Sequence, residues 1–207
     1  MNAPPGTGVP PAAAGERPVA GLLLAAGGGL RLGGRPKALL RYEGRLFVEN
    51  AAGALLAAGC APVHVVLGAA EAEVRARARL DGCALVSNPA WESGMGSSLR
   101  AGLASLPPGT GGALVALVDQ PGVGAEAMAR VRDALRSPAT LAAAAYGGRR
   151  GHPVLIGAAH FAAVAGAARG DRGARGYLRE REVALIECGD IATPDDIDEP
   201  GDLVDLP

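Results

Sequence analysis

The stretch from Leu22 to Leu40 constrains the fold more than any other part of the chain. The apolar run Val19–Ala26 breaks there into three consecutive glycines, and Arg31, two further glycines and Lys37 follow. An apolar run of this length that ends at glycine is typical of a buried strand. Glycines let the backbone approach a ligand closely and present its N–H groups, and the two cations add positive charge. The stretch therefore predicts a strand followed by a loop that cradles a nucleoside triphosphate.

Two common glycine-rich motifs do not fit this loop. The dinucleotide fingerprint G-x-G-x-x-G fails because Leu30 or Leu32 stands where a glycine is required. The P-loop pattern G-x-x-x-x-G-K-[ST] fails because Gly34 or Arg35 stands where the lysine is required. The loop is therefore neither an ordinary Rossmann cofactor loop nor a P-loop. The simpler alternative is a glycine-rich turn in a chain that has 32 glycines.

Length and composition predict a single globular domain. The 207 residues can bury a sizeable core, and because only 3% are aromatic that core must be built from Ala, Val, Leu and Ile. The formal net charge of −1 gives no electrostatic case for binding nucleic acid or an anionic membrane. Cys60, Cys83 and Cys188 are odd in number and far apart, which favours reduced thiols in a cytoplasmic protein over a zinc site or disulfides.

The first 18 residues differ from the rest of the chain. They are rich in Pro, Gly and Ala and lack the basic start and apolar stretch of a signal peptide. We expect a disordered leader over residues 1–18 and one domain over residues 19–207. No apolar run approaches about 20 residues, so no transmembrane helix is expected.

Strand and helix patterns alternate after the leader. Strands are predicted at 19–25, 63–67, 113–118, 141–146, 154–156 and 183–186, with a short one from 85; helices are predicted at 47–58, 71–80, 97–106, 124–136 and 158–168. Alternation of helices with continuously apolar strands predicts an α/β fold, in which a mostly parallel sheet is covered on both faces.

Carboxylates are expected near the carboxyl ends of these strands, where such sheets bind ligands. Asp119 directly follows the strand 113–118 and is well placed to hold Mg²⁺ beside triphosphate oxygens. Asp196 and Asp198 alternate along an extended segment, so both would point to one side and could supply a second metal ligand. The alternatives are an aspartate in a turn before proline and an acidic loop that caps a final helix.

Two further segments are candidates for substrate contact. Residues 88–99 follow a strand and open a helix, so their hydroxyls and amides could contact a base or a phosphate; the alternative is helix capping by Ser97. Residues 148–153 place Arg150 and His152 before a strand, which would suit an anionic second substrate; the alternative is a tight turn.

Six motifs, in this order, resemble those of the MobA-like nucleotidyltransferase family, and specifically its molybdenum cofactor cytidylyltransferase branch. The loop LAAG-x-S-x-R-M-G-x-x-K is matched by 24–27, Arg31, Gly33 and Lys37, although Gly29 replaces the serine, Leu32 replaces the methionine and three residues instead of two separate Gly33 from Lys37. The other motifs are N-P-x-W-x-x-G-M-x-x-S-L at 88–99, D-Q-P at 119–121, G-H-P-V at 151–154, G-D-x-G-A-R at 170–175 and, in part, D-I-D-T-P-E-D-L at 196–203.

The resemblance implies a three-layer α/β/α, Rossmann-like nucleotidyltransferase fold of the GT-A-like kind. It also implies a Mg²⁺-dependent reaction in which a phosphate on molybdopterin attacks the α-phosphate of CTP, CMP is transferred and pyrophosphate leaves. Such an acceptor is ionised near pH 7, so catalysis needs positioning and charge neutralisation rather than a general base. A molybdoenzyme or its chaperone is the implied protein partner.

The same resemblance implies roles for individual residues. The catalytic residues would be Arg31, Lys37 and Asp119, with Mg²⁺ held by Asp119 together with Asp196 or Asp198, and the acceptor would contact Gln120, Arg150 and His152. The remaining nucleotide contacts would come from Leu24, Ala25, Ala26, Gly27, Gly28, Gly29, Asn88, Gly94 and Ser98.

Three alternatives stay open at this point. Ala26 favours CTP, but Gly29 is shared with the guanylyltransferase branch, so GTP is an alternative donor. The acceptor could be another phosphorylated small molecule, such as a sugar phosphate, methylerythritol phosphate or phospholactate. A non-catalytic nucleotide-binding or cofactor-binding protein on the same fold is the third alternative.

Overall fold

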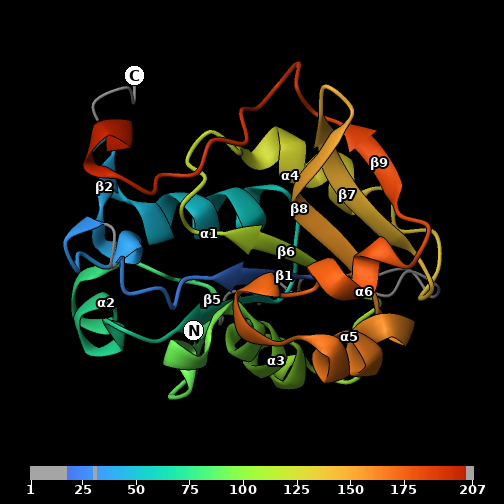
Figure 1. Cartoon of the computed structure of the whole chain (residues 1–207), viewed down its shortest axis with the longest axis horizontal. Helices are drawn as coiled ribbons and strands as arrows, with labels where there is room; N and C mark the ends of the chain where they lie inside the picture. The colour runs from blue at the N-terminus through green and yellow to red at the C-terminus, as the bar shows by residue number, and fades with distance from the viewer. Residues whose placement is uncertain (1–17, 30–31, 204–207) are drawn as a thin grey trace, which may run out of the picture.

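A seven-stranded sheet forms the centre of the computed structural model, which describes residues 18–29 and 32–203 (Figure 1). The strand order is β5-β4-β1-β6-β8-β7-β9, and only the two pairs made by β8 are antiparallel. The strands are β1 (Val19–Leu24), β4 (Val63–Leu67), β5 (Cys83–Ser87), β6 (Gly112–Leu117), β7 (Leu141–Tyr146), β8 (Arg149–Gly157) and β9 (Ala184–Glu187).

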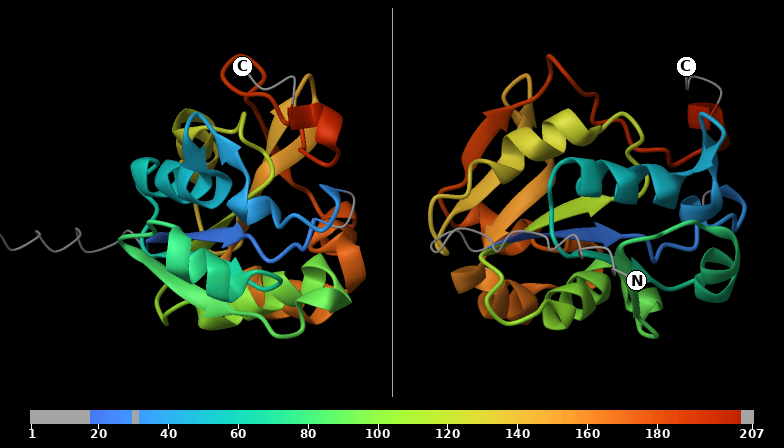
Figure 2. Two further views of the ribbon diagram at one scale, coloured as in Figure 1. Left: turned by 90° about the vertical axis from the view of Figure 1, so that its left-hand side faces the viewer. Right: turned by 180° about the vertical axis from the view of Figure 1, so that it is seen from behind.

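Helices cover both faces of the sheet, which makes three layers (Figure 2). Helices α1 and α4 lie on one face, and α3 and α5 lie on the other (Figure 1). The six α-helices are α1 (Phe47–Ala57), α2 (Glu71–Arg77), α3 (Met95–Ser105), α4 (Ala125–Arg132), α5 (Phe161–Ala167) and α6 (Arg175–Arg179). Short 3-10 turns and one small hairpin complete the chain: η2 (Lys37–Leu39), β2 (Arg41–Tyr42), β3 (Arg45–Leu46), η3 (Trp91–Ser93), η4 (Ala158–His160), η5 (Gly170–Arg172) and η6 (Pro200–Leu203).

The first strand shows why the sheet needs helices on both sides. Every residue of β1 after Val19 is buried, so alternate side chains enter two different cores. Leu23 packs with Phe47 of α1 in one core, whereas Leu22 packs with Leu99 of α3 in the other. The predicted α/β architecture with a mostly parallel, doubly covered sheet is confirmed.

Strand β8 runs against its neighbours because of a tight hairpin. Gly147 and Gly148 have φ of +58° and +75° and connect the paired residues Tyr146 and Arg149. Two residues of this conformation make the turn that suits a twisted hairpin. The carboxylate of Glu187 accepts hydrogen bonds from the amides of both glycines. The expected tight turn in 148–153 therefore lies at 147–148, and Arg149–Gly151 belong to the strand.

Helix α3 begins two residues earlier than the sequence predicts. Its first residue is Met95, and the hydroxyl of Ser97 donates to the carbonyl of Gly94 at 2.8 Å instead of capping the helix. The predicted capping by Ser97 is therefore wrong. The small hairpin of β2 and β3 had no prediction, because its strands are too short to show a hydrophobic pattern.

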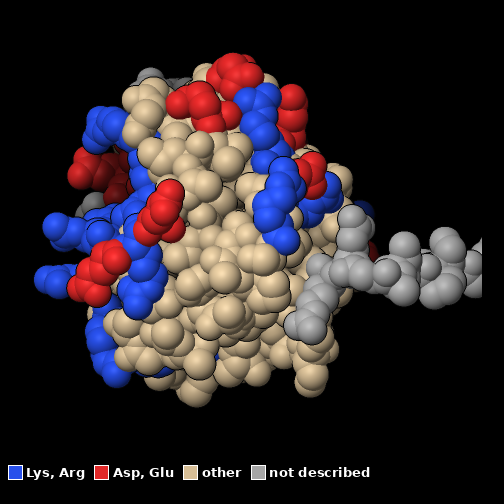
Figure 3. All heavy atoms as spheres, turned by 90° about the vertical axis from the view of Figure 1, so that its right-hand side faces the viewer, with Lys and Arg blue, Asp and Glu red and all other residues tan. Residues whose placement is uncertain are grey.

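Charged side chains of both signs share the face of the molecule seen in Figure 3. They gather along its upper and left margins around a broad uncharged area, in line with the formal net charge of −1. Within the described residues, no helix has the length and apolar character that crossing a membrane requires. Most of the expected leader, residues 1–17, lies outside the described residues.

Candidate active site

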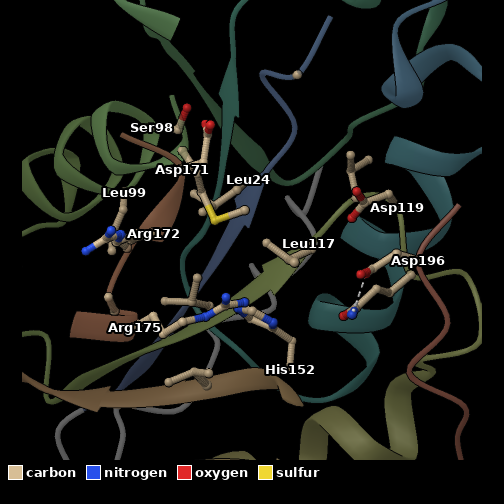
Figure 4. Close-up of a pocket in the computed structure, with 18 of the residues that line it drawn as sticks. Leu24, Ser98, Leu99, Leu117, Asp119, His152, Asp171, Arg172, Arg175 and Asp196 are labelled. Carbon is tan, nitrogen blue, oxygen red and sulfur yellow. Dashed lines mark hydrogen bonds between the residues drawn. The ribbon is translucent and has the colours of Figure 1, made fainter. Parts of the chain in front are cut away.

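A cleft of about 980 Å³ opens beyond the carboxyl ends of β1 and β6 (Figure 4). Asp119 and Asp196 lie on one side of it, and Arg172 lies on the other side together with Asp171. Leu24 and Leu117, the last residues of the two strands, form part of the apolar floor between them. The cleft lies where parallel α/β sheets bind their ligands.

The glycine loop is fixed at its start and open in its middle. The amide of Ala25 donates to Val66 of β4 at 3.0 Å, and the carbonyl of Leu24 accepts from the amide of Val118 at 3.2 Å. The amides of Gly27 and Gly28, which line the cleft, have no acceptor among the described residues. Free amides beside a ligand-sized cleft are suited to bind phosphate oxygens.

Gly29 sets the course of the loop. Its φ is +63°, and its carbonyl accepts hydrogen bonds from the amides of Leu32 and Gly34 at 2.9 and 3.0 Å. A Cβ at this position would lie 1.8 Å from the carbonyl oxygen of Arg35. The serine that the family motif carries here therefore cannot be accommodated by this loop as it stands.

The single tryptophan packs against the same loop. A Cβ at Gly28 would lie 3.2 Å from the ring of Trp91, and one at Gly68 would lie 2.6 Å from its Cβ. Trp91 lines the cleft, and Asn88 lies three residues before it. The buried Asn88 amide donates to the hydroxyls of Ser97 and Ser98 at 2.8 and 3.0 Å, which ties the start of α3 to the end of β5.

Lys37 joins two carboxylates across the mouth of the cleft. Its Nζ lies 2.6 Å from Oδ2 of Asp119 and 2.6 Å from Oδ1 of Asp198. The side chain of Lys37 is only 15% exposed. Burial lowers the pKa of this ammonium, but attraction and hydrogen bonds from the two carboxylates outweigh it and raise the pKa overall.

The C-terminal segment is docked along the loop after β6. The amide of Ile197 donates to the carbonyl of Asp119 at 2.9 Å, and the Ile197 side chain is buried. The Gln120 amide donates to Oδ1 of Asp196 at 2.8 Å. The carboxylate of Asp202 accepts from the amide of Asp198 at 2.8 Å. The bonds from Ile197 and Gln120 join residues that are almost 80 positions apart and bring them to one edge of the cleft.

The donor set fits a divalent cation that is shared with a substrate. Within the described ranges, no group of three His, Cys, Asp or Glu could hold a metal alone. Mg²⁺ is commonly bound by one or two carboxylates together with substrate phosphates and water, and Asp119 and Asp198 already converge on one cation. Burial, followed by the charge of Asp119, raises the pKa of Asp196, which disfavours a third carboxylate charge here.

The opposite side of the cleft is cationic. Arg172 and Arg175 line it from η5 and the start of α6, and neither guanidinium has a hydrogen bond or ion pair in the part of the chain that the structure describes. Arg150 of β8 also lines the cleft, and its guanidinium donates to the carbonyl of Leu178 at 3.3 Å. Unpaired guanidinium groups at the rim of a cleft are suited to receive an anion.

His152 is a neutral side chain between these charges. It extends into the cleft beside Arg175 (Figure 4). Burial, with smaller contributions from Arg175 and Arg150, lowers the pKa of His152 to about 4. The imidazole is therefore uncharged at pH 7 and can donate and accept hydrogen bonds without adding charge.

We expect His152 to weaken the fold as the pH decreases. The pKa of the imidazole is about 4 in the folded chain, against 6.5 as its ordinary value. Only the unfolded chain therefore takes up a proton between pH 6.5 and 4, and stability present above pH 6.5 is lost through this window. Urea unfolding at pH 7.5 and 4.5 measures the loss. The decrease in the free energy of unfolding between these two pH values should be larger in the natural protein than in His152→Gln by on the order of 2 kcal/mol. Equal decreases would contradict the lowered pKa of His152.

The structure brings most of the predicted site residues together. Ala25 and Asn88 do not line the cleft, and Arg31 lies outside the described residues. The predicted residues that line it are Leu24, Ala26, Gly27, Gly28, Gly29, Lys37, Gly94, Ser98, Asp119, Gln120, Arg150, His152, Asp196 and Asp198.

Trp91, Arg172 and Arg175 are among the residues that line the cleft although the sequence assigned them no individual role. Each belongs to a motif that was identified at 88–99 or 170–175. The signal was therefore present as a motif, but periodicity does not show which of its side chains face a ligand.

Comparison with known proteins identifies relatives over nearly the whole chain. The profile of the MobA-like NTP transferase domain matches residues 21–185. The nicotine blue oxidoreductase of Paenarthrobacter nicotinovorans is 47% identical over 189 residues, which is 87% of this chain and 92% of that protein.

Solved structures agree with this assignment. Rv0371c from Mycobacterium tuberculosis H37Rv has a TM-score of 0.78 and 30% identity over 91% of this chain and 97% of that one. A complex of the same protein with manganese has a TM-score of 0.76, 28% identity and the same coverage. A nucleotidyl transferase from Methanothermobacter has a TM-score of 0.77 at 22% identity, over 91% and 95% of the two chains, which shows the shared fold.

Proposed function

Because the chain belongs to the MobA-like NTP transferase family, and is therefore a nucleotidyltransferase, we propose that it transfers CMP from CTP to molybdopterin. The proposal rests on one cleft that brings three features together. These are loop amides that have no acceptor among the described residues, a lysine that bonds to two aspartates, and arginines along the opposite side. The nucleotide would lie along the loop, and the acceptor would lie toward the arginines.

The proposed reaction needs no general base. A phosphate oxygen of the acceptor attacks the α-phosphorus of CTP, and the bond to the departing pyrophosphate breaks. Lys37, together with Arg31, would stabilise the negative charge that develops on the leaving group. Mg²⁺ bound at Asp119 and Asp198 would supply further charge neutralisation and fix the triphosphate. Manganese in a related structure is consistent with divalent metal use in the family.

The floor of the cleft favours a flat heterocyclic acceptor over a sugar phosphate. Between the loop and the arginines it is lined by aliphatic side chains, which include Leu24, Val115, Leu117, Val154 and Ile156. A polyol placed there would lose hydrogen bonds to water without replacement, whereas a ring system would bury apolar faces. The rim arginines would then bind the phosphate of the acceptor.

Pyrophosphate release tests the proposal directly. Purified protein is incubated with Mg²⁺, molybdopterin and, separately, CTP, GTP, ATP or UTP. Release with CTP alone, together with a dinucleotide product, is the expected result. Preference for GTP would keep the reaction but change the donor. No release with any nucleotide, while a control enzyme is active, would point to another acceptor or a non-catalytic binder.

The similarity to a nicotine blue oxidoreductase favours a second candidate, the reduction of nicotine blue. A reductase of this kind would need an electron donor such as NADH or NADPH, and the glycine loop lacks the dinucleotide fingerprint. Loss of nicotine blue absorbance that depends on protein and NAD(P)H would support this candidate. The same mixture without reductant is the control.

Lys37→Ala should impair triphosphate use far more than folding. Removal of the ammonium takes away a charge beside the phosphates, so we expect kcat/KM for CTP to decrease by about 100-fold or more. It also removes the ammonium that lies between Asp119 and Asp198, which should cost about 1–2 kcal/mol of stability because the group is only partly buried. Steady-state kinetics and urea unfolding measure the two effects. Unchanged kinetics would remove Lys37 from the site.

Arg175→Met should affect the acceptor and spare the nucleotide. The variant keeps most of the side-chain volume but loses the unpaired guanidinium, so KM for the acceptor should rise about tenfold or more while KM for CTP stays within about twofold. Arg179→Met is the matched control, because Arg179 lies on the same helix, α6, but does not line the cleft. Equal effects of the two substitutions would exclude a specific contact.

A further inference from the structure

Lys37 is the only lysine in a chain that has 19 arginines. An ammonium differs from a guanidinium in being a compact charge on a flexible stem, so it can fill the position of a small cation and can also move. Here it lies 2.6 Å from one oxygen of Asp119 and 2.6 Å from one oxygen of Asp198. These are the two carboxylates that would hold the divalent cation of the proposed reaction.

We propose that, before ligands bind, the Lys37 ammonium lies between Asp119 and Asp198, at the position where the divalent cation would bind. When metal and nucleotide bind together, the ammonium leaves the two carboxylates and contacts the triphosphate instead. The inference rests on the proposed nucleotidyl transfer. It adds that the binding of metal and the binding of nucleotide are coupled through Lys37, which does not follow from family membership.

Electrostatics requires this exchange if the two aspartates bind metal. A divalent cation bonds to carboxylate oxygens at about 2.0–2.1 Å, so it would stand in direct repulsion with an ammonium that stayed on the same oxygens. The ammonium has somewhere to go, because Lys37 lines the same cleft as the free amides of Gly27 and Gly28. A triphosphate bound at those amides would offer it new anionic partners.

The exchange predicts that metal alone binds weakly and that metal with nucleotide binds well. Without nucleotide, the metal must displace an ammonium that loses two carboxylates and gains nothing. With nucleotide, the same ammonium gains phosphate oxygens, so the two ligands promote each other's binding. Until metal and nucleotide bind, the single ammonium offsets part of the negative charge of the two carboxylates.

Mn²⁺ binding without nucleotide tests the first half of the proposal. Electron paramagnetic resonance of free Mn²⁺ gives its affinity for the natural protein, Lys37→Met, Lys37→Arg and the control Arg41→Met. Arg41 is an exposed cation whose guanidinium, within the described residues, donates to the carbonyl of Gly44. Lys37→Met should bind Mn²⁺ about tenfold more tightly, because the competing charge is gone. Lys37→Arg keeps the charge but not the compact ammonium, so its affinity for Mn²⁺ should lie between those of Lys37→Met and the natural protein. Arg41→Met should stay within about twofold of the natural protein. Binding by Lys37→Met that is no tighter than that of the natural protein would overturn the proposal.

The second half is tested in the natural protein, so it does not depend on the folding of a variant. Labelling with ¹⁵Nζ-lysine gives one side-chain signal, because the chain has one lysine. Mg²⁺ alone should shift this signal little, and Mg²⁺ with CTP should shift it strongly. A signal that does not respond to saturating Mg²⁺ and CTP would overturn the exchange while leaving nucleotidyl transfer intact. If CTP neither binds nor turns over, the proposed function fails, and the Mn²⁺ comparison still reports on Lys37.

Discussion

Asp119→Asn is expected to reduce pyrophosphate release by about 1,000-fold or more while leaving the fold intact. The substitution keeps the shape of the side chain but removes the charge that would hold the metal. Asp119 directly follows β6, and its backbone carbonyl, which accepts the amide of Ile197, is unchanged by the substitution. The side chain is 20% exposed and, among the described residues, bonds to Lys37, so few packing contacts change. Rates with saturating CTP and Mg²⁺ give the measurement.

A matched control distinguishes the effect of losing a carboxylate in the cleft from the effect of losing a carboxylate elsewhere on the protein. Asp190 is paired with Arg130 on the surface, is 59% exposed and does not line the cleft. Asp190→Asn should therefore retain nearly the full rate. A correctly folded Asp119→Asn variant with the activity of this control would exclude the metal role of Asp119.

Gly29→Ser should weaken nucleotide binding strongly, although it restores the residue that the family motif carries. The backbone at Gly29 has a positive φ, and the added Cβ would lie 1.8 Å from the carbonyl oxygen of Arg35. The loop must move to relieve this contact, and the carbonyl of Gly29 would then lose the amides of Leu32 and Gly34. We expect the affinity for CTP to decrease by about 100-fold or more, because the phosphate-binding amides lose their arrangement. The fluorescence of Trp91, the single tryptophan, reports binding.

Gly33→Ser provides the comparison for this substitution. Gly33 has nearly the same φ, +70°, but nothing lies within 4 Å of the position of its Cβ. The Gly33→Ser substitution should therefore lower the free energy of unfolding by about 1 kcal/mol, which is the cost of a positive φ, and should change the affinity for CTP only modestly. If the two substitutions weaken CTP binding equally, the close contact with Arg35 is not what excludes serine at position 29.

The sequence was most informative where burial dictates pattern. β1, β4 and β6 are apolar on both faces because two helical layers cover them, so their positions could be predicted to within a residue or two. The direction of β8 could not be predicted, because it depends on pairing set by the turn at Gly147 and Gly148. Periodicity carries no information about such pairing.

The candidate site divides in the same way. Asp119 and the glycine loop could be predicted because they follow apolar strands, where ligands bind in this class of sheet. The burial of Asn88 could not be predicted, because polar segments give no sign of which side chain turns inward. The contact of Lys37 with Asp198 joins residues 161 positions apart, and only the docked C-terminal segment brings them together.

The docked C-terminal segment has a consequence for biosynthesis. All seven strands of the sheet are complete at Glu187, yet Asp196 and Asp198 have still to emerge from the ribosome at that point. The nascent chain can therefore assemble its sheet before it has a finished catalytic edge, and a premature stop codon just after β9 would encode a sheet without Asp196 and Asp198, two of the carboxylates that line the cleft.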